Sequence, residues 1–261
     1  MMTQKKYPLQ EIVQKYINAY ININSFDVIN PATNEKITSV PSLKSEHIQD
    51  AITTASNSYT SFWKGTLSQK RSNYLLNWAN TLEKEVDQLA LLLTIEQGKT
   101  LSEAHAELQW AIDSVRNYAY EARRICGQIL PYPGDNRESF VIKEPFGVIG
   151  SITPWNFPAG ISINTIAAAL ASGNTIVIKP AEDTPLTVIA AAMLAYNSGL
   201  PTGVIQVLTT QTPSVAGDIL CNDTRFFYRV YSDRKKTIRK LLIYSKKYSL
   251  RIRWKLSFYY I

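Results

Sequence analysis

Three short apolar runs, separated by helical stretches, follow one another between residues 147 and 208. They span residues 148–153, 175–179 and 204–208, and turn residues bound each of them. Runs that are apolar on both faces are typical of strands inside a parallel sheet, which helices cover on either side. Parallel strands also need crossover connections, which the helical stretches supply. The pattern therefore predicts an α/β fold.

A mainly helical segment precedes this region. Residues 25–40 predict two short strands joined by a turn. Apolar residues at helical spacing predict helices that begin near Ser45, which is an expected cap, after Leu67 and over residues 102–124. Gly98 is the expected end of the second of these helices.

Proline and glycine mark two further turns. Residues 127–145 predict a β-hairpin around the turn Pro131-Tyr132-Pro133-Gly134. Thr184 is placed to cap the helix that follows the second apolar run, with Pro185 as the first helical residue.

The charge of the chain is divided unevenly. The formal net charge is +7, yet residues 1–225 hold 17 Lys+Arg and 20 Asp+Glu, a net of −3. Residues 226–261 hold 11 Lys+Arg and one acid, a net of +10, and 10 of these residues are aromatic. A basic, aromatic segment can bind nucleic acid or an anionic membrane. We favour neither, because this segment lacks Gly, Pro and Ala and has poor periodicity.

Composition excludes several other classes. Hydrophobic residues make up 45% of the 261 residues, which indicates a globular chain. No run of about 18 apolar residues predicts a membrane span, and the polar N-terminus does not resemble an export signal. Cys126 and Cys221 give neither a disulfide framework nor a metal-ligand spacing. We expect a cytoplasmic protein, with Cys126 as a small buried side chain.

Polar side chains follow the first two predicted strands. Residues 153–158 read Thr-Pro-Trp-Asn-Phe-Pro, and residues 179–182 read Lys-Pro-Ala-Glu. Ligands of open parallel sheets bind at the carboxyl ends of the strands. Alone, Asn156 could be a simple turn former, and Lys179 with Glu182 a solvated pair.

These two segments resemble the NAD(P)-dependent aldehyde dehydrogenases, and the likeness covers residues 24–225. Segments 26–33, 96–99 and 144–148 match as well, and the succinate-semialdehyde dehydrogenase branch is the nearest. The resemblance implies a Rossmann-like cofactor domain, preceded by a helical segment. It also implies oxidation of an aldehyde to a carboxylic acid through a thiohemiacetal on a cysteine.

The resemblance assigns roles to eight residues. Asn156 would donate its side-chain amide to the developing oxyanion. The cofactor-binding residues would be Ile152, Thr153, Pro154, Trp155, Asn156, Lys179, Glu182 and Gly217. Lys179 and Glu182 would contact the adenine-side ribose, and Gly217 the pyrophosphate. Because a carboxylate repels a 2′-phosphate, Glu182 favours NAD, with NADP as the alternative. The chain contains no G-x-G-x-x-G motif.

One position departs from the semialdehyde branch. That branch usually carries an arginine for the substrate carboxylate where this chain has Asn164. An amide does not replace the charged, bidentate contact of arginine. The identity of the aldehyde substrate therefore stays open.

The family's nucleophilic cysteine and general-base glutamate are not recognised in this sequence. Neither Cys126 nor Cys221 lies in the expected context. Synonymous codons can be chosen for residues 227–231 and 251–256 so that translation from one base later gives two further sequence motifs of the family. We therefore expect residues 1–225 to be a partial cofactor domain and residues 226–261 an out-of-frame tail.

These expectations bear on activity and assembly. The chain is expected to be inactive; the alternative is a non-catalytic protein that retains a partial nucleotide site. The partner would be a small aldehyde, with no nucleic acid and no membrane. Intact relatives form homo-oligomers, but the strand that would pair with the 127–145 hairpin is not recognised here.

Overall fold

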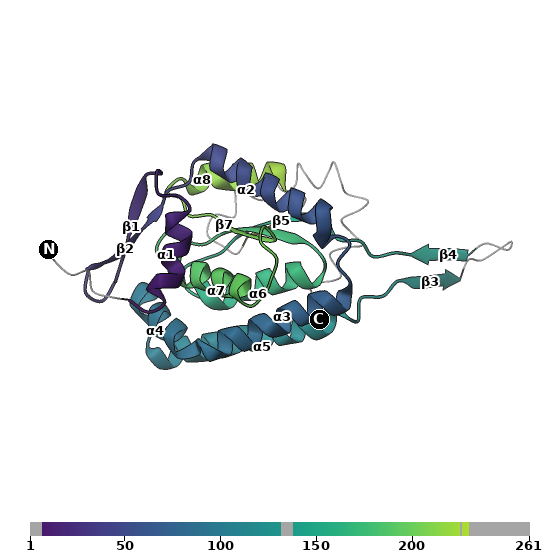
Figure 1. Ribbon diagram of the computed structural model, residues 1–261, viewed down its shortest axis with the longest axis horizontal. Coiled ribbons are helices and arrows are strands. Elements are labelled where there is room, and N and C mark those ends of the chain that lie inside the picture. Colours follow the sequence, from purple (N-terminus) through teal and green to yellow (C-terminus); the bar gives the residue numbers. More distant parts are fainter. Residues whose placement is uncertain (1–6, 132–137, 225, 230–261) are drawn as a thin grey trace. The chain divides into compact units, whose positions relative to one another are not determined.

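The computed structural model describes residues 7–131, 138–224 and 226–229 (Figure 1). The chain separates into two compact units, residues 1–228 and 229–261. The elements, in order, are α1 (Gln10–Asn18), β1 (Ser25–Ile29), β2 (Lys36–Pro41), α2 (Ser45–Ser58), the π-helical turn η1 (Tyr59–Trp63), α3 (Ser68–Lys84), α4 (Val86–Gln97), α5 (Leu101–Ala122), β3 (Gln128–Pro131), β4 (Glu138–Val141), β5 (Val148–Ile152), α6 (Pro158–Ala171), β6 (Thr175–Lys179), α7 (Leu186–Asn197), β7 (Ile205–Val207), α8 (Pro213–Asp223) and β8 (Phe226–Arg229).

A four-stranded sheet forms the centre of the domain, with strand order β7-β6-β5-β8. β5 pairs with β6, and β6 with β7, in parallel. The predicted α/β fold with a parallel sheet is confirmed, although the third strand is shorter than residues 204–208. β8 lies in the segment that was assigned to the tail, so the sheet continues past residue 225.

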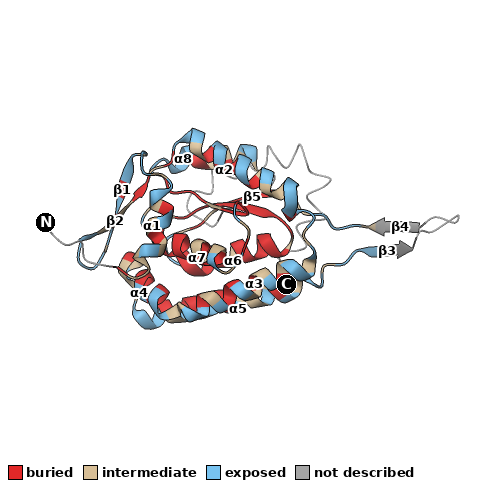
Figure 2. Ribbon diagram, in the orientation of Figure 1, coloured by how far each residue is buried: buried red, intermediate tan, exposed pale blue. Residues whose placement is uncertain are grey.

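Alternate residues of the strands face two different helical layers. Ile176 and Ile178 of β6 point into the core that contains α6 and α7, whereas Val177 joins the core beneath α2 and α8. Figure 2 shows the buried residues of α6 and α7 against the sheet. α5 then packs on α6, and α3 on α5. Both faces of the sheet are covered, which is why its strands are apolar throughout.

The N-terminal region agrees with the predicted pattern in most places. β1 and β2 pair antiparallel around the predicted turn. The helical region after Leu67 is two helices, α3 and α4, which meet at Glu85. Gly98 ends α4 with φ 91°, a left-handed conformation that favours glycine. Helix α1, which buries Val13 and Tyr16, was not predicted.

The predicted hairpin is present as the antiparallel pair β3 and β4, in which Gln128 pairs with Val141. Part of its turn lies outside the described residues. The expectation that Cys126 is buried is wrong, because its side chain is exposed. Cys126 follows the end of α5, in a link to the hairpin where the neighbouring residues are exposed or half-buried.

Two predicted caps are also wrong. Ser45 is the first residue of α2, and the backbone N–H of Lys44 before it donates to Nδ1 of His47 at 3.2 Å. Thr184 makes no capping bond to α7, which begins at Leu186. In both cases a side chain other than the expected hydroxyl meets the backbone at the start of the helix.

A buried carboxylate caps α7 instead. Oε2 and Oε1 of Glu96, on α4, accept hydrogen bonds from the backbone N–H groups of Leu186 at 2.7 Å and Thr187 at 2.8 Å. Glu107 does the same for α6, since its Oε1 accepts from the N–H of Gly160 at 2.8 Å. Burial raises the pKa of Glu96 to about 7.

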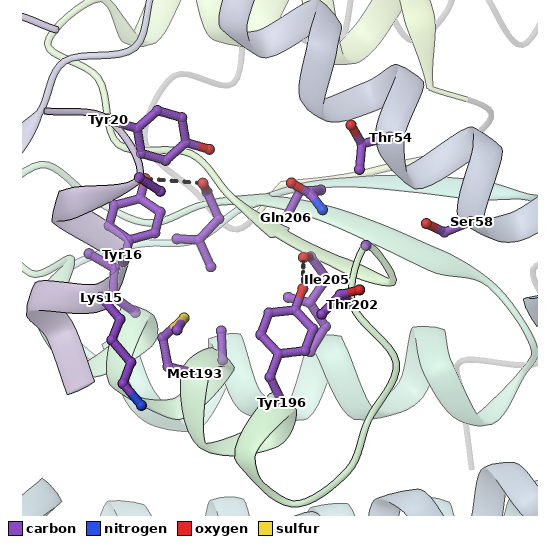
Figure 3. Close-up of a pocket in the computed structure, with 15 residues that line it drawn as sticks. Lys15, Tyr16, Tyr20, Thr54, Ser58, Met193, Tyr196, Thr202, Ile205 and Gln206 are labelled. Carbon is purple, nitrogen blue, oxygen red and sulfur yellow. Dashed lines mark hydrogen bonds between the residues drawn. The ribbon is translucent and has the colours of Figure 1, made fainter. Parts of the chain in front are cut away.

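Two tyrosines close one edge of the sheet (Figure 3). The hydroxyl of Tyr16, on α1, donates to the carbonyl oxygen of Val207 at 3.2 Å and lies 3.0 Å from the hydroxyl of Thr209. The hydroxyl of Tyr196, on α7, donates to the carbonyl oxygen of Ile205. Edge strands with free carbonyls can pair with other chains. These hydroxyls occupy two such carbonyls of β7.

The raised pKa of Glu96 predicts a pH dependence of stability. The carboxyl of Glu96 has a pKa of about 7 in the folded chain against an ordinary value of 4.5, so it keeps its proton to higher pH when the chain is folded. Its contribution to stability is therefore complete below pH 4.5 and is lost as the pH rises through 7. We would measure the free energy of unfolding in urea at pH 5 and pH 7.5. The wild type should lose stability between these pH values through Glu96, and Glu96→Gln should not, so the variant becomes more stable relative to the wild type at pH 7.5. Equal pH slopes for both proteins would contradict this.

The edge contact of Tyr16 can be tested with a matched pair of variants. Tyr16→Phe leaves the Val207 carbonyl and the Thr209 hydroxyl without this partner, and should lower the free energy of unfolding by about 1–2 kcal/mol. Tyr20→Phe is the control, because the Tyr20 hydroxyl makes no hydrogen bond among the described residues and its ring lies 5.3 Å from that of Tyr16. An equal decrease in the free energy of unfolding in both variants would show that the hydrogen bonds of the Tyr16 hydroxyl do not stabilise the fold.

Candidate functional site

The candidate site lies where β5 and β6 end. Ile152, the last residue of β5, is the register partner of Lys179, the last residue of β6. The loop 153–157 leaves β5 at this point and enters α6 at Pro158. Seven of the eight predicted site residues belong to these strand ends or to the loops that follow them. The parallel register is what brings them together.

Thr153 anchors the start of the loop. Its backbone N–H donates to the carbonyl oxygen of Lys179 at 3.0 Å, which extends the β5–β6 pairing by one residue. Its hydroxyl lies 2.9 Å from the hydroxyl of Ser162 on α6, and both side chains are buried. Thr153 is thus fixed to the sheet and to the helix at once, so it lies below the surface of the site.

The next residues of the loop face outward. The side chains of Trp155 and Phe157 are 59% and 47% exposed, and Asn156 between them is exposed too. The backbone carbonyl of Asn156 accepts a hydrogen bond from Nζ of Lys99 at 3.1 Å. The peptide of Asn156 is therefore held from the protein side, and its side-chain amide is accessible.

Lys179 and Glu182 form an ion pair at the end of β6. Nζ of Lys179 lies 2.8 Å from Oε1 of Glu182 and donates to the carbonyl oxygen of Pro180 at 3.0 Å. The Lys179 side chain is 2% exposed and that of Glu182 34%. A solvated surface pair, the alternative interpretation of these two residues, is therefore wrong. The carboxylate reaches the surface while the ammonium is buried.

Gly217 places the N-terminal half of α8 against the end of β5. A Cβ atom at Gly217 would lie 3.6 Å from Cδ1 of Ile152, an ordinary contact distance. Packing therefore does not require glycine here. Because glycine has no side chain, room remains beside Ile152 that a ligand could use.

Carboxylates occupy the N-termini of two helices at this end of the sheet. Glu107 meets the N-terminus of α6 and Glu96 that of α7. In an ordinary Rossmann site the helix after the first strand binds the pyrophosphate at that position. Here the carboxylate of Glu107 already accepts from the N–H of Gly160 at that position. α8 has no side-chain cap and no acidic residue in its first turn.

The sequence did not identify the roles of Glu96, Lys99 and Glu107. Segment 96–99 was noted only as a match to a family pattern. Glu107 carried one usable signal, since it is a charged residue on the otherwise apolar face of α5. A buried carboxylate needs partners, so this position could have been marked as one that contacts another element.

Other polar residues are not part of the site. Nε2 of His105 lies 3.6 Å from Oδ1 of Asp87 on α4. The described residues hold no group of three or more His, Cys, Asp or Glu side chains that could bind a metal ion. Within the same residues, no helix is long and apolar enough to cross a membrane.

A cavity of about 440 Å³ lies elsewhere, beside β7 (Figure 3). Residues of α1, α2, α7 and β7 and of adjoining loops line it, among them Tyr16, Ser58, Met193 and Gln206. None of the eight predicted site residues is in this lining.

Comparisons with known proteins agree with this geometry. Residues 20–228 match the aldehyde dehydrogenase family. The chain is 39% identical over 211 residues to a mitochondrial succinate-semialdehyde dehydrogenase of Oryza sativa subsp. japonica, which covers 81% of this chain and 40% of that protein. It is 38% identical over 201 residues to an NADP(+) succinate-semialdehyde dehydrogenase of Escherichia coli, covering 77% and 42%.

A solved structure shows the same arrangement. The succinate-semialdehyde dehydrogenase of Burkholderia pseudomallei superposes with a TM-score of 0.78 at 36% identity, over 84% of this chain and 45% of that one. The chain thus spans less than half the length of the relatives it matches. The family match over residues 20–228 and the identity to these relatives show that the chain belongs to the aldehyde dehydrogenase family of NAD(P)-dependent oxidoreductases.

Proposed function

We propose that this domain binds NAD(P) across the ends of β5 and β6 and belongs to an enzyme that oxidises an aldehyde to a carboxylic acid. The observation that carries the proposal is the register of Ile152 with Lys179, which places the Asn156 loop beside the Lys179–Glu182 pair. The Asn156 loop is suited to the reacting end of a dinucleotide, and the Lys179–Glu182 pair is suited to its ribose. The cofactor, when bound, accepts a hydride from the substrate.

Asn156 is proposed as the oxyanion donor. Its side chain is exposed, its backbone is held by Lys99, and an amide donates without a change of charge. Ile152, Thr153, Pro154 and Trp155 are proposed as its neighbours in cofactor binding, since they lead from β5 into this loop. Asn156 therefore stabilises negative charge on the substrate oxygen, and the fixed backbone limits the reorganisation that this requires.

The remaining residues are proposed to hold the nucleotide. The half-buried carboxylate of Glu182 accepts hydrogen bonds from ribose hydroxyls, while the buried ammonium of Lys179 orients it. The uncapped N-terminus of α8 and the free space at Gly217 favour the pyrophosphate at that helix. NAD is the preferred cofactor, although the Escherichia coli relative is named for NADP(+).

The substrate class is proposed from the relatives. Two of them act, by name, on succinate semialdehyde, an aldehyde that also carries a carboxylate. Asn164, which takes the position of the branch's arginine, is half-buried on α6. An amide there favours a substrate whose far end is polar without requiring a full negative charge.

Turnover of an aldehyde by this chain would need a nucleophilic cysteine near the candidate site. Its two cysteines are Cys126, exposed after α5, and Cys221, on α8. Neither lies on the strand-end loops that carry Asn156 and Glu182. We propose that this chain binds the nucleotide without aldehyde turnover, in keeping with a nucleotide-binding remnant.

Calorimetric titration of the full chain with NAD tests the site. We expect saturable binding and no NADH absorbance at 340 nm after succinate semialdehyde is added. Gly217→Leu should weaken the binding at least about tenfold, because the new side chain fills the space beside Ile152. Asn222→Leu, at an exposed position in the last turn of the same helix, is the control. Absence of binding by the folded wild type would refute the proposed function.

Glu182 is expected to set the choice between nucleotides. Glu182→Gln keeps the length of the side chain but removes its charge, so repulsion of a 2′-phosphate disappears while Lys179 remains. The ratio of the Kd for NADP to that for NAD should fall by roughly tenfold or more, as expected for the loss of one charged interaction. An unchanged ratio in parallel titrations would show that Glu182 does not select the cofactor.

A further inference from the structure

We propose that Lys99 and Glu107 are a positioning pair that fixes the peptide of Asn156 and so directs its side-chain amide. This inference rests on the proposed function, in which that amide meets the substrate. The pair connects the start of α5 to the loop 153–157 and to α6. It is separate from the residues that the family resemblance assigns to the site.

Lys99 makes three contacts around the loop. Its Nζ forms an ion pair with Oε2 of Glu107, donates to the carbonyl oxygen of Asn156 at 3.1 Å, and lies 4.5 Å from the ring centre of Phe157. The Lys99 side chain is only 10% exposed. An ammonium has three N–H donors, and here they are directed at a carboxylate, a carbonyl and an aromatic face.

Glu107 connects Lys99 to the first turn of α6. Its side chain is 1% exposed, and its second oxygen accepts from the N–H of Gly160 at 2.8 Å. One carboxylate therefore joins the ammonium that holds Asn156 to the first turn of α6. Because Thr153 is already fixed to β6, the loop is held at its start, at Asn156 and at its exit.

Gly160 makes this short link possible. A Cβ atom there would lie 2.5 Å from Cζ3 of Trp110 and 3.2 Å from Cγ of Glu107. α6 therefore approaches α5 closely enough for Glu107 to reach the backbone only because residue 160 has no side chain. The arrangement is set by packing and does not depend on the surface loop.

A purely structural role would hold α5 to α6 without affecting the loop. The double variant Lys99→Met with Glu107→Gln separates the two roles. It removes both buried charges together, so no unpaired charge remains, and the amide oxygen that replaces the carboxylate can still accept from the N–H of Gly160. What the double variant lacks is the donor to Asn156. Lys99→Arg retains a charged donor and serves as the conservative variant.

The test uses ¹⁵N relaxation of the full chain. In the wild type the amides of Trp155, Asn156 and Phe157 should have order parameters near those of rigid backbone, about 0.85. In the double variant they should fall below about 0.6, while the midpoint of thermal unfolding stays close to that of the wild type. Lys99→Arg should retain most of the order. Arg116→Met, which breaks the more exposed Arg116–Glu83 pair between α5 and α3, is the matched control and should change nothing in the loop.

Nucleotide titration gives an independent readout. The double variant should bind NAD roughly five- to tenfold more weakly, because a mobile loop must be ordered on binding. Wild-type order parameters in the double variant would overturn the positioning role, whether or not NAD binds. Conversely, a wild type with a rigid loop that binds no NAD would remove the proposed function and leave the positioning pair intact.

Discussion

Two buried carboxyl groups hold the N-terminal helices of this domain to the helices that cover the sheet. Glu96 and Glu107 come from α4 and α5, and each accepts hydrogen bonds at the N-terminus of a helix that follows a central strand. The N-terminus of a helix carries partial positive charge and unsatisfied N–H groups, so a carboxylate there satisfies both needs. The N-terminal helical segment is therefore bonded to the starts of α6 and α7 as well as packed on them.

This arrangement decides where a nucleotide can lie. Carboxyl groups already occupy the two helix ends that would attract phosphate, which leaves the strand ends and the first turn of α8. In the proposed function the nucleotide would therefore lie along the strand ends, between Glu182 and Asn156. A phosphate-binding glycine loop is unnecessary in such a site, which is why the absence of that motif does not argue against a dinucleotide.

Periodicity in the sequence was enough to predict the parallel sheet, the hairpins and most helices, because apolar spacing reflects burial directly. The strand-end loops with Asn156 and Lys179 were also found from local motifs. What local patterns missed are contacts between distant residues. Glu96 caps a helix 90 residues away, so the expected hydroxyl of Thr184 was displaced. Cys126 was misjudged because exposure depends on whether another element covers the end of α5.

The tyrosines on β7 also have a consequence for how the chain is made. Tyr196 precedes its partner Ile205 by nine residues, whereas Tyr16 precedes Val207 by 191. At ribosomal rates that separation corresponds to roughly 10–40 seconds of synthesis. Helix α1, the first to emerge, is therefore among the last elements that can reach its native place. A chain shortened at its N-terminus would keep β7 partly open and would be prone to join strands of other molecules.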